Sequence, residues 1–159
     1  MATLQLAHLD ARLVFLALQY HLARPGSELD PETKQPAAQG LAGVARTLEP
    51  QLDRAVASIE LNERQQERLI SAIAGAINEL KAYALLSAGG RSAAPAFEAT
   101  LQRLFPEVAE EPDEATQLAG HLLGLRRRLA QATMAVGAMN DAPAAARRPR
   151  WQFWRRDGG

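Results

Sequence analysis

The stretch "PDEATQLAGHLLGLRRRLAQATMAVGAM", residues 112–139, carries the clearest periodic pattern in the sequence. Its apolar residues recur in alternating steps of four and three, at Leu118, Leu122, Leu125, Leu129, Ala132, Val136 and Met139. This spacing places them on one face of an α-helix. It predicts a helix over residues 112–139 whose seam either packs inside a bundle or joins two copies in a homo-oligomer. Gly120 and Gly124, four residues apart, would let a neighbouring backbone approach closely.

The same spacing recurs along most of the chain, and no segment alternates apolar and polar residues with the β-branched content of a strand. The predicted fold class is therefore all-α, a helical bundle of four to five helices with a flexible C-terminal tail. The expected helices cover residues 3–23, 37–59, 62–86, 95–105 and 112–139. The first has the broadest apolar face, which predicts a central position in the bundle.

The middle of the chain leaves a helix boundary open. Pro50 removes an internal hydrogen bond and should bend or split the helix near Leu48. Asn62 and Gln65 have the spacing of a capping box, which favours a new helix that starts at Asn62. Because the apolar register continues across this point, one long helix over residues 50–86 is the alternative.

The length of 159 residues suits one domain. Beyond Met139, the segment "NDAPAAARRPR" holds two prolines and no apolar residue larger than alanine. Such a composition is typical of a flexible linker. We therefore predict a helical bundle domain over residues 1–140, followed by a linker and an Arg/Trp-rich tail over residues 141–159.

Composition points to a bacterial, cytoplasmic protein. The chain holds 32 alanines, and arginine outnumbers lysine by 16 to 2, a bias typical of GC-rich bacterial genomes. The N-terminus lacks the basic region, apolar core and cleavage site of a secretory signal. No apolar run approaches the roughly 20 residues that span a bilayer. Membrane association, if present, would be peripheral at the inner face. Without cysteine, disulfides and thiolate chemistry are excluded.

No motif for catalysis or metal binding emerges. The three histidines, His8, His21 and His121, are far apart in the sequence, and no Glu-x-x-His pair of the di-iron type occurs. A phosphate loop, a nucleophile elbow and a histidine–glutamate zinc helix are also missing. We therefore predict that the protein is not an enzyme, with no catalytic residue, cofactor or metal site.

The segment "RRPRWQFWRR", residues 147–156, holds five arginines, three aromatic residues and both tryptophans of the chain. Its composition resembles short cationic tryptophan-rich membrane peptides of the antimicrobial kind, and this resemblance implies no family for the protein. Tryptophan favours the headgroup region, and arginine is attracted to anionic leaflets. We predict an interaction or scaffold module that docks reversibly on an anionic membrane surface. The predicted binding residues are Arg147, Arg148, Arg150, Trp151, Phe153, Trp154, Arg155 and Arg156.

A protein partner is the alternative, because tryptophan and arginine dominate interface hot spots and a terminal peptide can dock in a groove. The groove could belong to another protein or to the chain itself. Residues 1–146 hold 13 basic and 17 acidic residues, whereas residues 147–159 hold five arginines and one aspartate. The acidic segment Glu107–Glu114 could therefore receive the tail, in the same chain or in a swapped dimer.

The triplet Arg126, Arg127 and Arg128 is a secondary contact candidate. It should project away from the leucine seam, either as a solvated face or as a contact to phosphate or an acidic partner. Three arginines on an acidic domain form a small footprint for nucleic acid. Nucleic acid is thus not an expected partner, although single strands could stack on the tail aromatics and pair with its charges.

Overall fold

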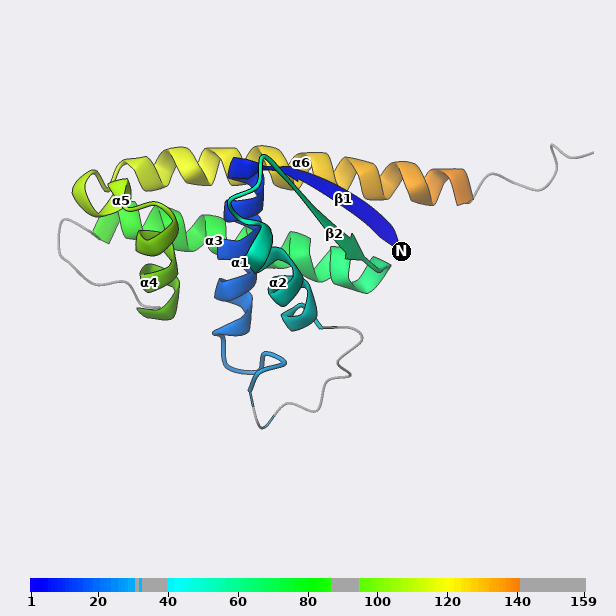
Figure 1. Ribbon diagram of the computed structural model, residues 1–159, viewed down its shortest axis with the longest axis horizontal. Coiled ribbons are helices and arrows are strands. Elements are labelled where there is room, and N and C mark those ends of the chain that lie inside the picture. The colour runs from blue at the N-terminus through cyan, green and yellow to red at the C-terminus, as the bar shows by residue number, and fades with distance from the viewer. Residues whose placement is uncertain (31, 33–39, 87–94, 141–159) are drawn as a thin grey trace, which may run out of the picture.

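The computed structural model describes residues 1–30, 32, 40–86 and 95–140, with side chains as far as residue 132. Within this part, the chain is mostly helical, with six α-helices and one small two-stranded antiparallel sheet (Figure 1). The prediction of a mostly helical fold is confirmed. The prediction of an all-α fold is wrong, because the described residues include two strands.

The sheet pairs β1 (Ala2–Ala7) with β2 (Val56–Leu61) in antiparallel register, with Leu4 opposite Ile59 and Leu6 opposite Ala57. Leu6, Ala57 and Ile59 are buried and Leu4 is half-buried, so one face of the sheet covers the core. The residues between them point to the other, more exposed face. This alternation has the period of two that a one-sided sheet requires.

Two predicted helices are corrected by these strands. The helix expected over residues 3–23 begins only at His8, because Leu4 and Leu6 lie on one face of a strand. The helix expected over residues 37–59 is reduced to α2 (Ala42–Leu48) and a 3-10 turn, η2 (Glu49–Gln51), and β2 follows. Pro50 lies in the first turn of η2, so the break expected near Leu48 is present.

The outer edge of β2 is closed by the side chain of Gln51. The Ser58 backbone N–H donates to Gln51 Oε1 over 3.0 Å, and Gln51 Nε2 donates to the Ser58 carbonyl over 3.1 Å. Gln51 Nε2 also donates to the Thr47 carbonyl at the end of α2. The amide therefore occupies the place of a peptide group in a third strand, which protects an edge that would otherwise be open to pairing.

The central element is α1 (His8–Leu22). All six residues from Leu13 to Leu18 are buried, so this helix is covered on every side. It packs against α2, α3 (Glu63–Leu86), α4 (Pro95–Leu104) and α6 (Glu114–Asn140). The predicted central position of the first helix is confirmed.

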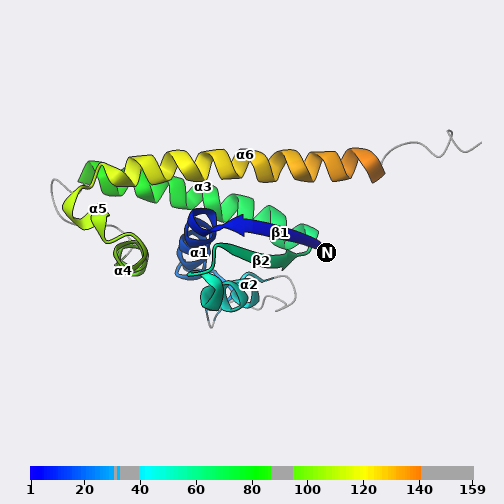
Figure 2. The same ribbon diagram turned by 45° about the horizontal axis from the view of Figure 1, so that its top comes forward.

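The helices α3 and α6 lie side by side, run in opposite directions and form a long outer layer (Figure 2). The seam leucines Leu118, Leu122, Leu125 and Leu129 are buried, so this part of the predicted seam packs inside the chain. Ala132 is exposed, which corrects its assignment to the seam. The side chains of Val136 and Met139 lie outside the described residues.

The capping box at the start of α3 is confirmed. The Gln65 N–H donates to Asn62 Oδ1 over 2.9 Å, and the Asn62 N–H donates to Gln65 Oε1 over 3.0 Å. Gln65 Nε2 also donates to the Gly40 carbonyl over 2.9 Å, which ties this corner to the start of α2. Since β2 ends at Leu61, one long helix over residues 50–86 is excluded.

The segment between α3 and α6 follows the prediction closely. In α4, Phe97, Leu101 and Leu104 are buried, as its spacing predicts. A further short helix, α5 (Glu107–Glu110), was not predicted from the sequence and buries Val108. The Tyr83 hydroxyl of α3 donates to the Val108 carbonyl over 3.4 Å, so α5 is held against the outer layer.

At Gly75, α3 packs against the side chain of Tyr20 from α1. A Cβ atom at Gly75 would lie 2.1 Å from Tyr20 Cε1 and 2.9 Å from the Tyr20 hydroxyl oxygen. The ring of Tyr20 also meets that of Phe97 edge to face, with centroids 6.0 Å apart, and the Arg24 guanidinium lies over it. Glycine is therefore required here by the ring that joins α1, α3 and α4.

We predict that Gly75→Ala lowers the free energy of unfolding by about 1–3 kcal/mol, the usual cost of overpacking, because Tyr20 must leave its place. In a Tyr20→Ala background the same change should raise stability by about 0.5–1 kcal/mol, since alanine favours the helix. Urea unfolding followed by circular dichroism measures both effects.

Gly120→Ala in α6 is the matched control. No atom of the described residues lies within 4 Å of the Cβ that it would add, so this variant should be more stable than the parent by about 0.5–1 kcal/mol. If Gly75→Ala lowers stability by the same amount in the parent and in the Tyr20→Ala background, the proposed clash with the Tyr20 ring is wrong.

A second prediction concerns the capping box. Asn62→Ala should cost about 1 kcal/mol, because it leaves the Gln65 N–H without its cap. Gln65→Ala should cost more, because it also removes the bond to Gly40. Thermal unfolding measures both, with the exposed Ser71→Ala as a neutral control; equal losses for the two caps would argue against the link between α3 and α2.

Candidate functional site

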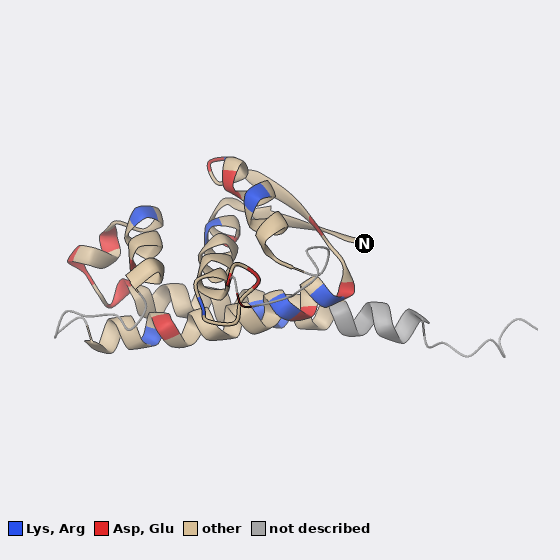
Figure 3. Cartoon of the chain, turned by 90° about the horizontal axis from the view of Figure 1, so that it is seen from below, with Lys and Arg blue, Asp and Glu red and all other residues tan. Residues whose placement is uncertain are grey.

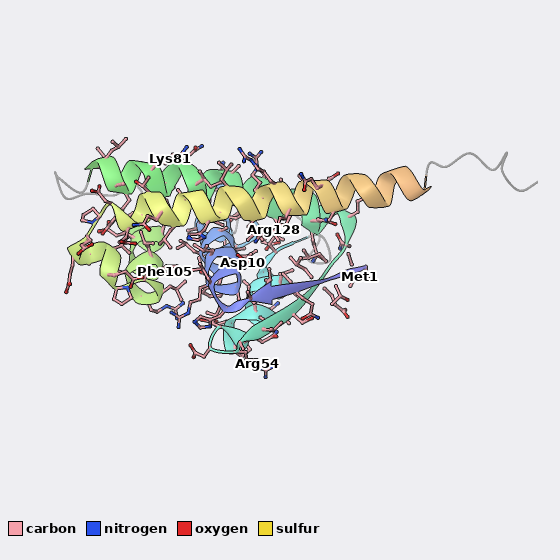
Figure 4. The ribbon with its side chains drawn as sticks, turned by 90° about the horizontal axis from the view of Figure 1, so that it is seen from above. Met1, Asp10, Arg54, Lys81, Phe105 and Arg128 are labelled. Carbon is pink, nitrogen blue, oxygen red and sulfur yellow. The ribbon has the colours of Figure 1, made fainter. Side chains whose placement is uncertain are left out.

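The predicted arginine triplet lies on α6, on the outer layer of the molecule. Arg128 Nη2 contacts Asp10 Oδ2 over 2.9 Å, which ties α6 to the first turn of α1 (Figure 4). The Arg128 side chain is 60% exposed and that of Asp10 is 24% exposed. A pair so open to water contributes at most about 1 kcal/mol, so its main effect is to orient Arg128 toward α1.

The other two arginines of the triplet face solvent. Arg126 and Arg127 are exposed, and neither has an ion-pair or hydrogen-bond partner within the described residues. Both lie between the buried Leu125 and Leu129, and the helical twist turns them away from the α3–α6 seam. All three arginines of the triplet are exposed, as the prediction that they project away from the seam requires.

The charge boundary of the chain falls at the start of α6. Residues 1–114 hold ten basic and sixteen acidic residues, whereas residues 115–159 hold eight arginines and two aspartates. From Ala115 to Asn140 the helix has no carboxylate. The basic part of the molecule therefore comprises the body of α6 as well as the tail sequence.

The acidic segment lies at the other end of α6. Its exposed carboxylates are those of Glu107, Glu110, Glu111 and Asp113, on α5 and the turn after it. Figures 1 and 3 place this segment beside the first turn of α6, and Asn140 ends α6 at the opposite side of the molecule. The structure thus separates the acidic segment from the point at which the tail begins.

The predicted binding residues of the tail, Arg147 to Arg156, lie outside the described residues, as does the linker before them. The site that the structure describes is consequently the α6 surface and its surroundings. Sequence reasoning missed Asp10 as the partner of Arg128, because 118 residues separate the two and no local pattern joins them.

The glycines of α6 do not have the role that their spacing suggested. No described atom lies within 4 Å of a Cβ placed at Gly120, and at Gly124 the nearest is Arg128 Nη1, at 3.8 Å. Neither glycine therefore serves a close approach of α3. Because glycine has no side chain, the outward side of α6 is low at these two positions, between Gln117 and Gln131.

The histidines are not brought together. His8 Nδ1 contacts the Arg54 carbonyl at 3.3 Å, and His121 is exposed on α6. Burial lowers the pKa of His21 most; the nearby Glu28 carboxylate opposes this shift, and the charges of Arg24 and Arg68 add to it. No group of three or more His, Asp or Glu side chains within the described part could hold a metal ion.

A shallow groove of about 520 Å³ lies between α2 and the outer edge of β2. It is lined by Met1, Gly40, Gly43, Val44, Thr47, Ser58, Ile59, Glu60 and Gln65. Glu60 is the one ionisable side chain among these lining residues, so this set offers neither an acid–base pair nor a metal-ligand cluster. The groove was missed from the sequence because β2 was assigned to a helix.

By length and composition alone, α3 is apolar enough to cross a membrane. Its apolar stripe, however, is buried in the chain, with Leu69, Ile73, Ile77 and Leu80 among the core residues. A core helix of a globular domain passes the same test of length and composition. In this structure α3 buries one side against the rest of the chain and leaves the other side exposed.

Comparison with known proteins identifies no relative. No protein-family model matches the chain, and no curated protein and no solved structure is significantly similar to it.

Proposed function

We propose that the protein is a non-enzymatic interaction module of the bacterial cytoplasm, which docks reversibly on the anionic inner face of the membrane. Its C-terminal segment, residues 147–156, supplies five arginines and three aromatic side chains. The observation that favours an external surface over the chain's own acidic segment is the position of that segment. It lies at the far end of α6 from Asn140 (Figure 1).

To reach the acidic segment of its own chain, the tail would have to run back along the whole length of α6. Its 27 residues span about 40 Å at 1.5 Å per residue. An extended chain gains at most about 3.6 Å per residue, so the ten residues from Asn140 to Arg150 reach at most about 36 Å. The backbone of the tail up to Arg148 therefore falls short of Glu114 in the same chain, whereas Arg155 and Arg156 lie far enough along the sequence to reach it.

The expected strength of docking is moderate. Arginine near an anionic leaflet contributes about 1 kcal/mol, so the five tail arginines supply roughly 5 kcal/mol before the aromatic contribution. Tryptophan adds to this at the headgroup level. Such an interaction is reversible, and it weakens as salt screens the charges.

We predict that the intact protein sediments with vesicles of phosphatidylglycerol and phosphatidylcholine, and that a chain ending at Ala146 does not. Trp151 and Trp154 are the only tryptophans, so intrinsic emission reports on the tail alone. It should shift to the blue on anionic vesicles and stay unchanged with phosphatidylcholine alone.

Two variants separate charge from aromatic burial. Replacing Trp151, Phe153 and Trp154 by alanine keeps the charge, and replacing the five arginines by glutamine keeps the aromatics; each should weaken binding. Equal sedimentation of the intact and shortened chains would refute docking through the tail.

A second control tests the alternative in which the tail binds the acidic segment. Glu110→Gln, Glu111→Gln and Glu114→Gln together should leave the emission of the lipid-free protein unchanged. Blue-shifted emission without lipid, moving to the red in this variant, would support the latch instead. If dilution abolished the shift, the latch would be between two copies.

A further inference from the structure

We infer that α6 is a second membrane contact, which lies along the bilayer with Arg126 and Arg127 against lipid phosphates. This inference rests on the proposed function, because the tail brings the helix to the surface. It adds an orientation: the outer layer faces the lipid, and the sheet and α4 face away from it.

Accessibility supports this assignment. In Figure 2, α6 runs along the upper boundary of the molecule, with α1 and the sheet to one side of it. Arg126 and Arg127 are exposed and without a partner in the described chain, whereas Arg128 is held by Asp10 of α1. Two guanidinium groups are therefore free, and each can bind a phosphate through two hydrogen bonds.

The shape of the helix surface allows a flat approach. Successive residues on a helix turn by about 100°, so Gly120, Gly124, Arg127 and Gln131 share the side that points away from the buried seam. No described atom stands over Gly120. Arg127 therefore lies on a part of α6 whose neighbours include two glycines, and Arg126 lies about 100° from it around the helix, at the border of the same exposed side.

The charge along α6 favours lipid phosphates over an acidic side chain of the same chain. The helix has no carboxylate from Ala115 to Asn140, so nothing on its own surface repels an anionic leaflet. The nearest carboxylates along α6 are at its first turn, about 20 Å from Arg127 at 1.5 Å per residue. The C-terminal half of α6 is thus the part that approaches the lipid.

The spacing of the two contacts is compatible with one plane. Thirteen residues separate Arg127 from Asn140, a distance of about 20 Å along the helix. The next seven residues reach at most about 25 Å, so Arg147 can touch the same leaflet. Once the tail is bound, α6 is kept near the surface, and the second contact adds avidity without a new partner.

The test compares two variants of the intact protein with the same net charge. Arg126→Gln/Arg127→Gln should weaken partitioning onto vesicles of phosphatidylglycerol and phosphatidylcholine by about fivefold for each arginine. Arg46→Gln/Arg54→Gln removes two exposed charges from α2 and from the turn before β2, on the side that faces away from the lipid, and should change it less than twofold. Co-sedimentation at two salt concentrations gives both partition coefficients.

Orientation is measured with a fluorescent label, because the chain has no cysteine of its own. A polarity-sensitive dye on Gln131→Cys should report a less polar environment on anionic vesicles. The same dye on Ala99→Cys, an exposed position of α4, should report no change.

The outcomes separate the two proposals. If the intact protein fails to bind vesicles, both are overturned. If it binds and the chain ending at Ala146 does not, but Arg126→Gln/Arg127→Gln binds like the parent, tail docking stands and the α6 contact is wrong. Equal dye responses at residues 131 and 99 would also overturn it. The α6 contact would also be overturned if Arg126→Gln/Arg127→Gln lost binding to single-stranded oligonucleotide and kept its binding to vesicles.

Discussion

The constraint on which the structure depends is the burial of α1 on every side. Six consecutive residues, Leu13 to Leu18, have almost no exposed surface, and a helix without a polar face needs neighbours all around it. The α3–α6 layer covers one side, α4 another, and α2 with the sheet the rest. Because each buried leucine contributes about 1.5–3 kcal/mol, the short sheet, α2 and α4 are stabilised mainly by the apolar surface that they bury with α1.

This arrangement explains which elements could be predicted from the sequence. The helices α3, α4 and α6 carry their own three–four pattern, and the capping box at Asn62 marks a boundary with two hydrogen bonds. The strands carry weaker signals. β1 has no β-branched residue except Thr3, and its partner lies about fifty residues away. Strand pairing depends on such distant contacts, whereas helix spacing is local.

The same difference between local and distant information applies to the candidate site. Composition alone indicated the basic tail, the arginine triplet and the acidic segment. What composition could not give is their arrangement, because that follows from the length of α6 and from the ion pair that orients Arg128 toward Asp10. Nor could sequence show that Gly120 and Gly124 face away from α3, since the direction of a glycine depends on where the neighbouring helix packs.

The length of α6 also bears on how a protein with no net charge can be drawn to an anionic surface. At physiological salt, charges more than about 8 Å apart are largely screened from one another. The acidic segment and the end of α6 are separated by several times this distance, so their fields do not cancel. In the docking that we propose, a membrane would therefore meet the arginines of one end without repulsion from the acidic segment at the other. A compact arrangement of the same residues would bring the two signs within the screening length and remove this attraction. In the proposed docking, the length of α6 thus keeps the acidic segment from cancelling the charge of the arginines.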